Sequence, residues 1–291
     1  MEIEVTFISD PGCPWGYSAS PSLAALQWRY GPRLTWRLVT IGLADDASGY
    51  EARGYDPIMM GQRMEMFRQF GMPFTVGPRA RLTGTGRACK ALQAVRIISP
   101  GAEITAFRAL QFGWFTTRML MDEDDNIATA LARVPGLDVH AVMGLLDDPA
   151  VDAAYQADKA EARTAAGSPT EFQGKAANTD GAVRYTAPSL IFSAGDRTLE
   201  AGGFQPMEAY DVIVANLDPS GSRRAVPDDR PEDVLREFPL GLSTQEVAEV
   251  MRTDIERPLN REAAAQSLIR AVGRGTVAVE PLGDDGLWRA T

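Results

Sequence analysis

The chain has 291 residues, of which 45% are hydrophobic and 23% charged, so it has the composition of an ordinary globular protein. This length favours one main domain with an insertion or a small appended unit. The 29 basic and 39 acidic residues give a net charge of −10, which provides no long-range attraction to nucleic acid or to an anionic membrane. We therefore expect no nucleic-acid partner and no membrane association.

The N-terminus and the cysteines indicate a cytoplasmic protein. The chain begins Met1-Glu2-Ile3-Glu4 and passes directly into a strand pattern, without the basic and apolar regions of a secretory signal. No apolar run approaches the roughly 18 to 20 residues that a membrane helix needs. Cys13 and Cys89 are far apart in sequence, and in a reducing compartment we expect both to remain thiols.

The first 41 residues predict a strand, a helix and a second strand. Residues 2–8 are apolar and rich in β-formers, residues 14–30 carry Ala, Leu and Trp at helical spacing, and residues 34–41 alternate. A single helix between two strands implies a parallel pair joined by a right-handed crossover.

The middle third of the chain predicts a block of helices. The strand signal fades from about residue 54 to residue 166, and Asp138 and Asp148 are suitable helix starts. The expected helices cover residues 57–70, 86–98, 103–121, 125–134, 139–146 and 149–166. After this block we expect strand character at 182–185, a hairpin of 189–192 with 197–200, and a closing helix at 206–217.

The last third predicts a linker and a small separate unit. Residues 218–227 are polar and contain Pro and Gly, which is typical of a linker. Helices are then expected at 231–238, at 243–252 with a capping box of Ser243 and Glu246, and at 261–273, before a terminal hairpin. This order resembles a winged-helix module. Residues 222–291 hold 10 Arg and no Lys against 13 acidic residues, a net charge of −3, so we expect dimerisation or covering of the main domain rather than nucleic-acid binding.

A single cysteine stands at the start of the first predicted helix, in the segment Cys13-Pro14-Trp15-Gly16. A strand that delivers a cysteine to the first turn of a helix is the layout of a thioredoxin-type site, which normally carries Cys-x-x-Cys. Unpaired backbone N–H groups and the helix dipole are expected to lower the pKa of Cys13, and Pro14 suits a position that needs no N–H donor. Gly16 stands where the second cysteine would be. An external thiol such as glutathione or mycothiol would therefore have to resolve a mixed disulfide at Cys13.

Two segments carry a family resemblance. They are Ser9-Asp10-Pro11 leading into Cys13-Pro14-Trp15 and Tyr17, and the later Thr186-Ala187-Pro188-Ser189. On these segments the chain resembles the DsbA family of thioredoxin-fold proteins, in particular its cytosolic FrnE-like branch, which places a cis-proline beside the active site. The helical block matches the inserted helical domain of that family, and the resemblance covers about residues 1–217.

The resemblance implies an α/β protein with a thioredoxin-like fold. We expect a thioredoxin-like domain of residues 1–53 and 180–217 and an inserted helical domain of 54–179. The linker of 218–227 and the winged-helix-like module of 228–291 are expected from the residue pattern alone, because the resemblance does not extend to them. It implies catalytic roles for Cys13, Pro14, Trp15, Gly16 and Pro188, with Trp15 as a partly exposed wall of the site. It implies substrate-binding roles for Asp10, Tyr17, Thr186 and Ala187. No metal and no tightly bound cofactor are expected.

Three functions are compatible with these residues. The favoured one is a monothiol oxidoreductase or thiol transferase that uses Cys13 with glutathione or mycothiol as co-substrate, acting on a small-molecule or peptide substrate. The second is a non-catalytic protein that binds a peptide or small ligand, because the loss of a resolving cysteine at Gly16 is what a repurposed site would show. The third is a transferase or isomerase like the kappa-class glutathione transferases and hydroxychromene carboxylate isomerases, which are related to the family and use Ser near the nucleophile position.

Other reactive side chains favour structural interpretations. Cys89 lies in a predicted helix among small and apolar neighbours, so we expect a buried inert thiol, or else a distal resolving cysteine if the insertion packs over Cys13. His140 is the only histidine and is expected near a helix start at the surface. A methionine-rich stretch at residues 59–72 is expected to be core or, alternatively, the lining of a hydrophobic substrate groove.

Overall fold

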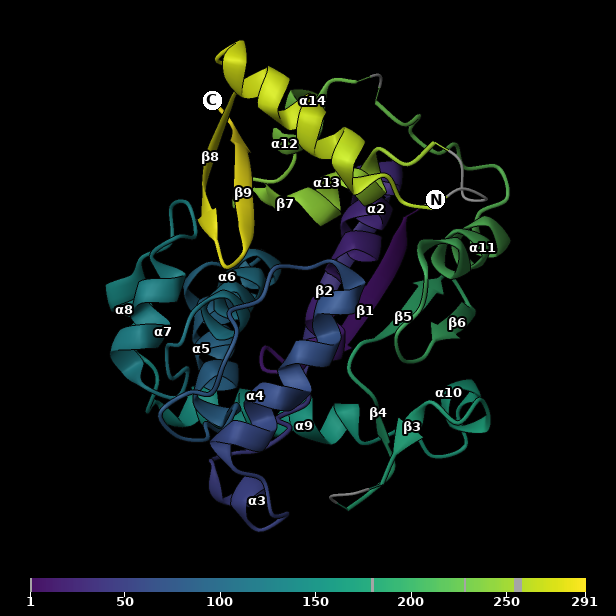
Figure 1. The fold of residues 1–291 in the computed structure, drawn as a ribbon. Helices are drawn as coiled ribbons and strands as arrows, with labels where there is room; N and C mark the ends of the chain where they lie inside the picture. The colour runs from purple at the N-terminus through teal and green to yellow at the C-terminus, as the bar shows by residue number, and fades with distance from the viewer. Residues whose placement is uncertain (1, 179–180, 228, 254–257) are drawn as a thin grey trace.

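The computed structural model describes residues 2–178, 181–227, 229–253 and 258–291. Its central sheet has the strand order β2-β1-β5-β6 (Figure 1). Strand β1 (Ile3–Ser9) runs parallel to β2 (Leu34–Thr40) and antiparallel to β5 (Ser189–Ala194), which in turn pairs with β6 (Arg197–Ala201). The predicted strand–helix–strand opening and the predicted late hairpin are therefore confirmed.

The predicted helix of residues 14–30 is broken at one point. Helix α1 (Pro14–Ser18) ends at Ala19, and α2 (Ser20–Tyr30) begins immediately after it, with Pro21 in its first turn. A short 3-10 turn, η1 (Gly31–Arg33), then leads into β2. Helix α11 (Met207–Leu217) closes this part of the chain, and it begins one residue later than predicted.

The middle of the chain is a block of helices, as predicted. They are α3 (Ser48–Glu51), α4 (Pro57–Glu65), η2 (Met66–Phe70), α5 (Gly86–Ile98), α6 (Glu103–Thr116), α7 (Asp124–Leu131), α8 (Val139–Gly144), α9 (Pro149–Ala162) and α10 (Pro169–Phe172). The side chains of Asp138 and Asp148 accept hydrogen bonds at the starts of α8 and α9, which confirms both helix starts. The predicted ends of α6, α7, α8 and α9 were two to five residues too late, and β4 (Arg184–Tyr185) pairs with β3 (Ala176–Ala177), which was not predicted.

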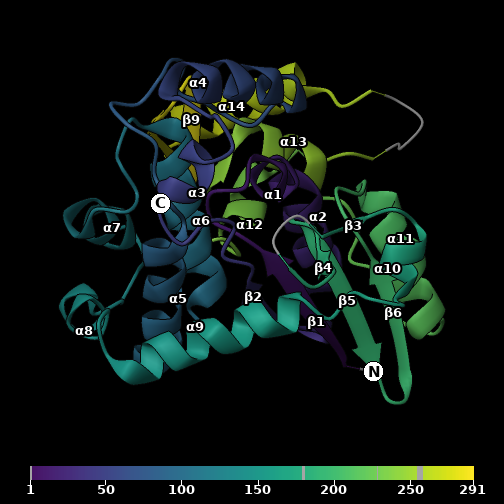
Figure 2. The ribbon, with the colours of Figure 1, turned by 90° about the horizontal axis from the view of Figure 1, so that it is seen from below.

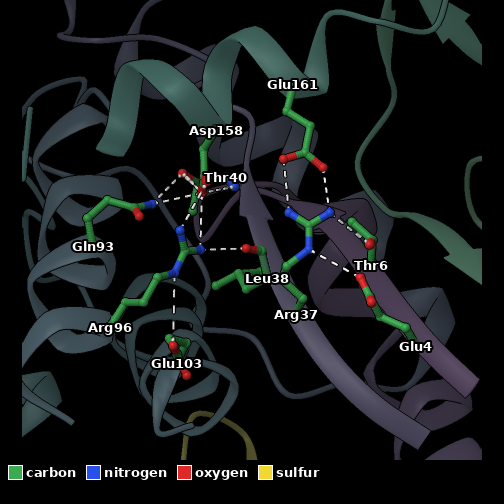
Figure 3. Close-up of polar contacts among 10 residues, drawn as sticks. All are labelled: Glu4, Thr6, Arg37, Leu38, Thr40, Gln93, Arg96, Glu103, Asp158 and Glu161. Atoms are coloured by element: carbon green, nitrogen blue, oxygen red, sulfur yellow. Dashed lines mark hydrogen bonds and ion pairs between the residues drawn. The ribbon is translucent and has the colours of Figure 1, made fainter. Parts of the chain in front are cut away.

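A buried carboxylate joins this helical block to the sheet (Figure 3). Asp158 on α9 accepts hydrogen bonds from the backbone N of Thr40 at 2.8 Å, from Gln93 Nε2 at 2.8 Å and from Arg96 Nη1 at 3.1 Å. Arg96 also donates to the carbonyl of Leu38 at 2.5 Å. The Asp158 carboxylate of α9 thus bonds to residues of both β2 and α5, and these hydrogen bonds together hold the three elements in place.

The C-terminal residues form a second, smaller sheet with the strand order β7-β9-β8. The elements are α12 (Pro231–Leu235), β7 (Leu242–Ser243), α13 (Thr244–Val250), α14 (Arg261–Gly273), β8 (Val277–Leu282) and β9 (Asp285–Ala290). The predicted capping box of Ser243 with Glu246 is present, and the three predicted helices and the hairpin are confirmed. Strand β7 was not predicted because two residues carry no alternation.

This C-terminal part packs on the thioredoxin-like part through α13 and α2 (Figure 2). One continuous hydrophobic core includes Phe7 of β1, Phe107 of α6 and Trp288 of β9. The predicted linker is also held in place, since the Ala225 carbonyl accepts from Trp28 Nε1 at 3.3 Å and the Arg224 guanidinium lies 4.3 Å from the Trp28 ring centroid. The division of the chain into units stays a prediction, and its boundary residues 180 and 228 lie outside the described residues.

Candidate active site

The fold brings the predicted nucleophile to the predicted cis-proline. Cys13 is the N-cap residue of α1, just beyond the end of β1, and β1 pairs with β5 so that Ile8 lies opposite Ser189. This register places the chain after β1 beside the chain before β5. The Ala187–Pro188 peptide bond is cis, as predicted, and Cys13 Sγ donates a hydrogen bond to the Ala187 carbonyl at 3.4 Å.

The pKa of Cys13 is not lowered, and that expectation was wrong. Only 6% of the residue is exposed, and burial raises the pKa of the thiol from its ordinary value of 9.0 to about 12. The backbone N–H groups of Gly16 and Trp15 act in the opposite direction, and the charge of Asp10 adds to the rise. The sequence argument considered the helix start alone, whereas the loss of water around the sulfur is the larger effect.

Gly16 lies in the first turn of α1 and has no room for a side chain. A Cβ atom built at this position would come within 2.6 Å of Ser9 Oγ and 3.7 Å of Cys13 Cβ. The Ser9 hydroxyl is buried and has no hydrogen-bond partner within the described residues. The distance to Cys13 Cβ is ordinary for a disulfide. A second cysteine at this position is therefore opposed by the Ser9 hydroxyl and not by its distance from Cys13.

Asp10 was expected to bind substrate, but it lies inside the protein. Its carboxylate accepts hydrogen bonds from the backbone N of Gly12 at 2.9 Å, the backbone N of Leu43 at 2.9 Å and Thr85 Oγ1 at 2.9 Å. Burial raises its pKa, although these hydrogen bonds act against the rise. All of these contacts hold the turn that leads into Cys13.

Cys89 contacts the same carboxylate. It is fully buried, its Sγ is 3.7 Å from Asp10 Oδ2, and burial raises the pKa of its thiol well above the ordinary value. Both cysteines are free thiols. The expected burial of Cys89 is confirmed, and its thiol contacts Asp10, while its lack of reactivity stays a prediction.

Tyr17 and Thr186 are also engaged with the protein. The Tyr17 hydroxyl donates to the Pro73 carbonyl at 2.9 Å, and its ring stacks on Phe115 with centroids 4.7 Å apart. Thr186 Oγ1 donates to the Lys175 carbonyl at 2.6 Å. Tyr17 therefore anchors α1 to the helical block, and Thr186 fixes the loop that carries Pro188.

Trp15 forms one wall of an aromatic cluster. Its side chain is 40% exposed, as expected for a wall of the site, and its ring centroid lies 5.0 Å from Phe67, 5.4 Å from Phe70 and 5.6 Å from Phe204. Phe204 follows β6 and was not singled out from the sequence, because it lies far from the motif along the chain and carries no local signal.

A pocket of about 360 Å³ opens beside this cluster, between the start of α1 and the helical block. Gly12, Pro14 and Trp15 line one side, and Met60, Met64, Met66 and Phe67 line the other. Part of the methionine-rich stretch therefore lines a pocket, which was the alternative expectation for it, while Met72 is buried in the core, which was the first expectation. This volume is within the range of small-molecule sites.

Together the fold and site define a thioredoxin-like protein with a helical insertion, in which a cysteine at a helix start faces a cis-proline. A family model described as the DSBA-like thioredoxin domain matches residues 4–187, and the chain belongs to this family. The expected resemblance is therefore confirmed, and the family is one of thiol-disulfide oxidoreductases and isomerases. A comparison with curated proteins finds no match.

Solved structures share the fold at low sequence identity. A protein from Nitrosomonas europaea provisionally assigned as a protein disulfide isomerase matches with a TM-score of 0.58 and 15% identity, over 76% of this chain and 100% of that one. The cytosolic disulfide reductase DsbM from Pseudomonas aeruginosa matches with a TM-score of 0.52 and 15% identity, over 75% and 100%. The structure of DsbM with glutathione matches with a TM-score of 0.51 and 16% identity, over 74% and 98%. Among the helices of the described residues, none is long and apolar enough to cross a bilayer.

Proposed function

We propose that this protein is a thiol-dependent oxidoreductase or thiol transferase in which Cys13 is the only catalytic thiol. The observation that carries the proposal is the position of Cys13, whose sulfur lies 3.4 Å from the Ala187 carbonyl and whose neighbours Gly12 and Pro14 line the pocket. A low-molecular-weight thiol, glutathione or mycothiol, serves as the co-substrate. Glutathione has support from DsbM, a relative of similar fold whose structure contains it.

The chemistry is two successive thiol–disulfide exchanges. The Cys13 thiolate attacks one sulfur of a substrate disulfide, forms a mixed disulfide with that half and expels the other half as a thiolate. The thiolate of the co-substrate then attacks the substrate sulfur of the mixed disulfide, releases a new disulfide and restores Cys13. Each step forms one S–S bond and breaks one, so no further oxidant or reductant is needed.

Formation of the thiolate limits the rate in this proposal. With a pKa of about 12, Cys13 is almost entirely protonated at neutral pH, and the thiolate is the attacking species. The amides of Trp15 and Gly16 already point to the sulfur and favour the charged form. The reaction rate should therefore rise with pH well above pH 9.

The other predicted site residues divide into two groups under this proposal. Trp15 lines the pocket and Ala187 accepts the hydrogen bond of Cys13 Sγ, so these two residues and the adjoining Pro188 contact substrate in this proposal. Asp10 and Tyr17 are positioning residues, since both are enclosed and their polar atoms bond to the protein. Thr186 acts in the same way by holding the loop before Pro188.

Treatment with glutathione disulfide at pH 9, followed by peptide mass mapping, tests this proposal. We expect one glutathione on Cys13, none on Cys89, and removal of the adduct by fresh glutathione. The Cys89→Ala chain should form the same adduct and the Cys13→Ser chain none. An adduct confined to Cys89, or a Cys13 that stays unmodified, would refute the role of Cys13.

A second candidate is a non-catalytic ligand-binding protein. It is favoured by the combination of a protonated, largely buried Cys13 with a pocket whose aromatic wall is already formed. In this case the Cys13→Ser chain would keep its full ligand affinity, and no thiol-dependent turnover of any disulfide would be measured for the unmodified chain.

The remaining expectations form part of the same proposal. The order α12-β7-α13-α14-β8-β9 with the sheet order β7-β9-β8 supports a winged-helix-like module, which covers α2 and does not bind nucleic acid. A cytoplasmic location is supported by DsbM, which is described as cytosolic. Homodimer formation stays a prediction.

A further inference from the structure

The pocket beside Trp15 has an unusual charge distribution. Four arginines line it, and the described residues that line it include no aspartate and no glutamate. These arginines are Arg63, Arg79, Arg81 and Arg118. The chain as a whole carries a net charge of −10, so this positive lining is a local feature.

Two of these arginines already have strong partners. Arg81 forms ion pairs with Asp122 at 2.6 Å and with Glu123 at 3.0 Å. Arg63 donates to the Tyr55 hydroxyl at 2.7 Å, and its guanidinium lies 4.6 Å from the centroid of the Tyr55 ring. Neither guanidinium needs a ligand to complete its contacts.

The other two arginines bond only to backbone carbonyls within the described chain. Arg79 Nε donates to the Met119 carbonyl at 3.2 Å, and Arg118 Nη2 donates to the Val76 carbonyl at 3.1 Å. The bonds are reciprocal, because each arginine reaches across to the segment that carries the other. Segments 75–79 and 115–119 therefore lie side by side, joined also by the Thr75 backbone N and the Phe115 carbonyl at 2.7 Å.

Arg79 is the more buried of the two arginines that have no carboxylate partner in the described part of the chain. Burial is the one cause that lowers its pKa, to about 10, and the Met119 carbonyl is its partner within the described residues. Burying a guanidinium without a counter-charge lowers the stability of the folded chain. An anion that enters the pocket and pairs with Arg79 would offset this loss of stability. The guanidinium presents several N–H donors, of which the Met119 carbonyl uses one.

The rest of the lining is apolar and aromatic. It includes Leu43, Met60, Met64, Phe67, Leu82 and Trp114. The volume of about 360 Å³ accommodates a body of one or two rings or a short acyl chain. A purely polar anion would leave this surface without apolar contacts.

We propose that this pocket binds a small anionic molecule with an apolar body, whose anionic group pairs with Arg79 and Arg118 and whose body lies against Trp15 and Phe67. This inference rests on the proposed function for one point only, that the bound molecule is the substrate presented to Cys13. The binding itself needs no thiol chemistry.

Isothermal titration calorimetry with two matched probes, 4-phenylbutyrate and 4-phenyl-1-butanol, tests the inference. The probes share the same body, and only the first carries a negative charge. We expect the unmodified chain to bind the carboxylate at least tenfold more tightly than the alcohol, and the Cys13→Ser chain to do the same. Equal affinity for the two probes, or no binding of the carboxylate, would overturn the inference whatever Cys13 does.

Substitutions at Arg79 locate the anionic group. Arg79→Gln should remove the preference for the carboxylate, and Arg79→Lys should keep a part of it. The control, Arg197→Gln, should leave the preference unchanged, because Arg197 on β6 donates to the Asn216 carbonyl and does not line the pocket. A preference that survives Arg79→Gln would contradict the role of Arg79.

S-Methylglutathione, an unreactive analogue of the co-substrate, serves as the third probe. If it binds more tightly than 4-phenylbutyrate and depends on Arg79, the arginines belong to the thiol co-substrate and the inference about an apolar substrate is wrong. If mixed disulfide forms at Cys13 while neither anionic probe binds, the proposed function survives and this inference fails.

Discussion

Cys13 combines two opposing influences on one sulfur atom. The backbone N–H groups at the start of α1 favour a thiolate, but burial of the sulfur, which donates to the Ala187 carbonyl, favours the thiol. A cysteine in this position is protected from adventitious oxidation, since it is the thiolate that reacts. Reactivity then depends on what enters the site.

The enclosed thiol makes stability depend on pH in a defined direction. The pKa of Cys13 is about 12 in the folded chain and 9.0 ordinarily. The buried thiol therefore contributes fully to the free energy of unfolding below pH 9, and this contribution is lost as the pH rises toward 12. Between pH 9 and 10.5 we expect the unfolding free energy to fall by about 1 to 2 kcal/mol more in the unmodified chain than in Cys13→Ser. Urea unfolding at several pH values measures this difference, and parallel curves for the two chains would contradict the raised pKa.

Gly16 and Ser9 provide a second test at the scale of single residues. Gly16→Cys should lower the free energy of unfolding by about 1 to 3 kcal/mol, because its Cβ would meet Ser9 Oγ at 2.6 Å. Adding Ser9→Ala should recover most of this loss, since the removed hydroxyl is buried without a partner.

Thiol counting in denaturant shows whether the double variant forms a dithiol. After oxidation we expect Ser9→Ala/Gly16→Cys to retain one free thiol, that of Cys89, while the unmodified chain retains two. If Gly16→Cys alone were as stable as the unmodified chain, the steric account of this position would be wrong.

At the scale of elements, Asp158 is the residue that fixes the helical block to the sheet. Asp158→Ala should lower the free energy of unfolding by about 2 to 4 kcal/mol, because it leaves the buried Thr40 backbone N–H and the Gln93 amide without their acceptor and removes an ion pair of Arg96. Glu161→Gln is the matched control on the same helix. Its ion pair with Arg37 is exposed on both sides, so its loss should be under about 1 kcal/mol. Equal effects of the two substitutions in chemical unfolding would contradict this ranking.

Elements with strong local signals could be predicted from the sequence, and contacts between distant segments could not. Helices α5 and α14 have the predicted bounds, and the Cys13 and Pro188 motifs do meet. The burial of Asp10 depends on Leu43 and Thr85, which lie far away in the sequence, so its substrate-binding role was inferred without knowledge of those contacts. The arginine lining was missed for the same reason.

At the scale of the whole molecule, the C-terminal part is held to the helical block by a largely buried ion pair. Arg108 on α6 pairs with Glu246 on α13 and donates to the Gly241 carbonyl at 3.0 Å. Since the hydrophobic core also continues from one part into the other, we expect the chain to unfold in one cooperative step.

Arg108→Ala tests this cooperation. We expect the loss of about 3 to 5 kcal/mol of unfolding free energy in a single transition, because Glu246 would stay buried without its counter-charge. Arg236→Ala, which removes an exposed ion pair with Asp233 inside the C-terminal part, should cost under about 1 kcal/mol. Two separate transitions seen by circular dichroism and by tryptophan fluorescence would show that the parts fold independently.

The most direct test of the single-thiol proposal is the glutathione-dependent reduction of a small disulfide, bis(2-hydroxyethyl) disulfide, at pH 9. We expect the unmodified chain and Cys89→Ala to turn over at similar rates that rise with pH, and Cys13→Ser to be inactive. A Cys13→Ser chain that keeps the rate, or a Cys89→Ala chain that loses it, would contradict the proposal that Cys13 alone carries the reaction.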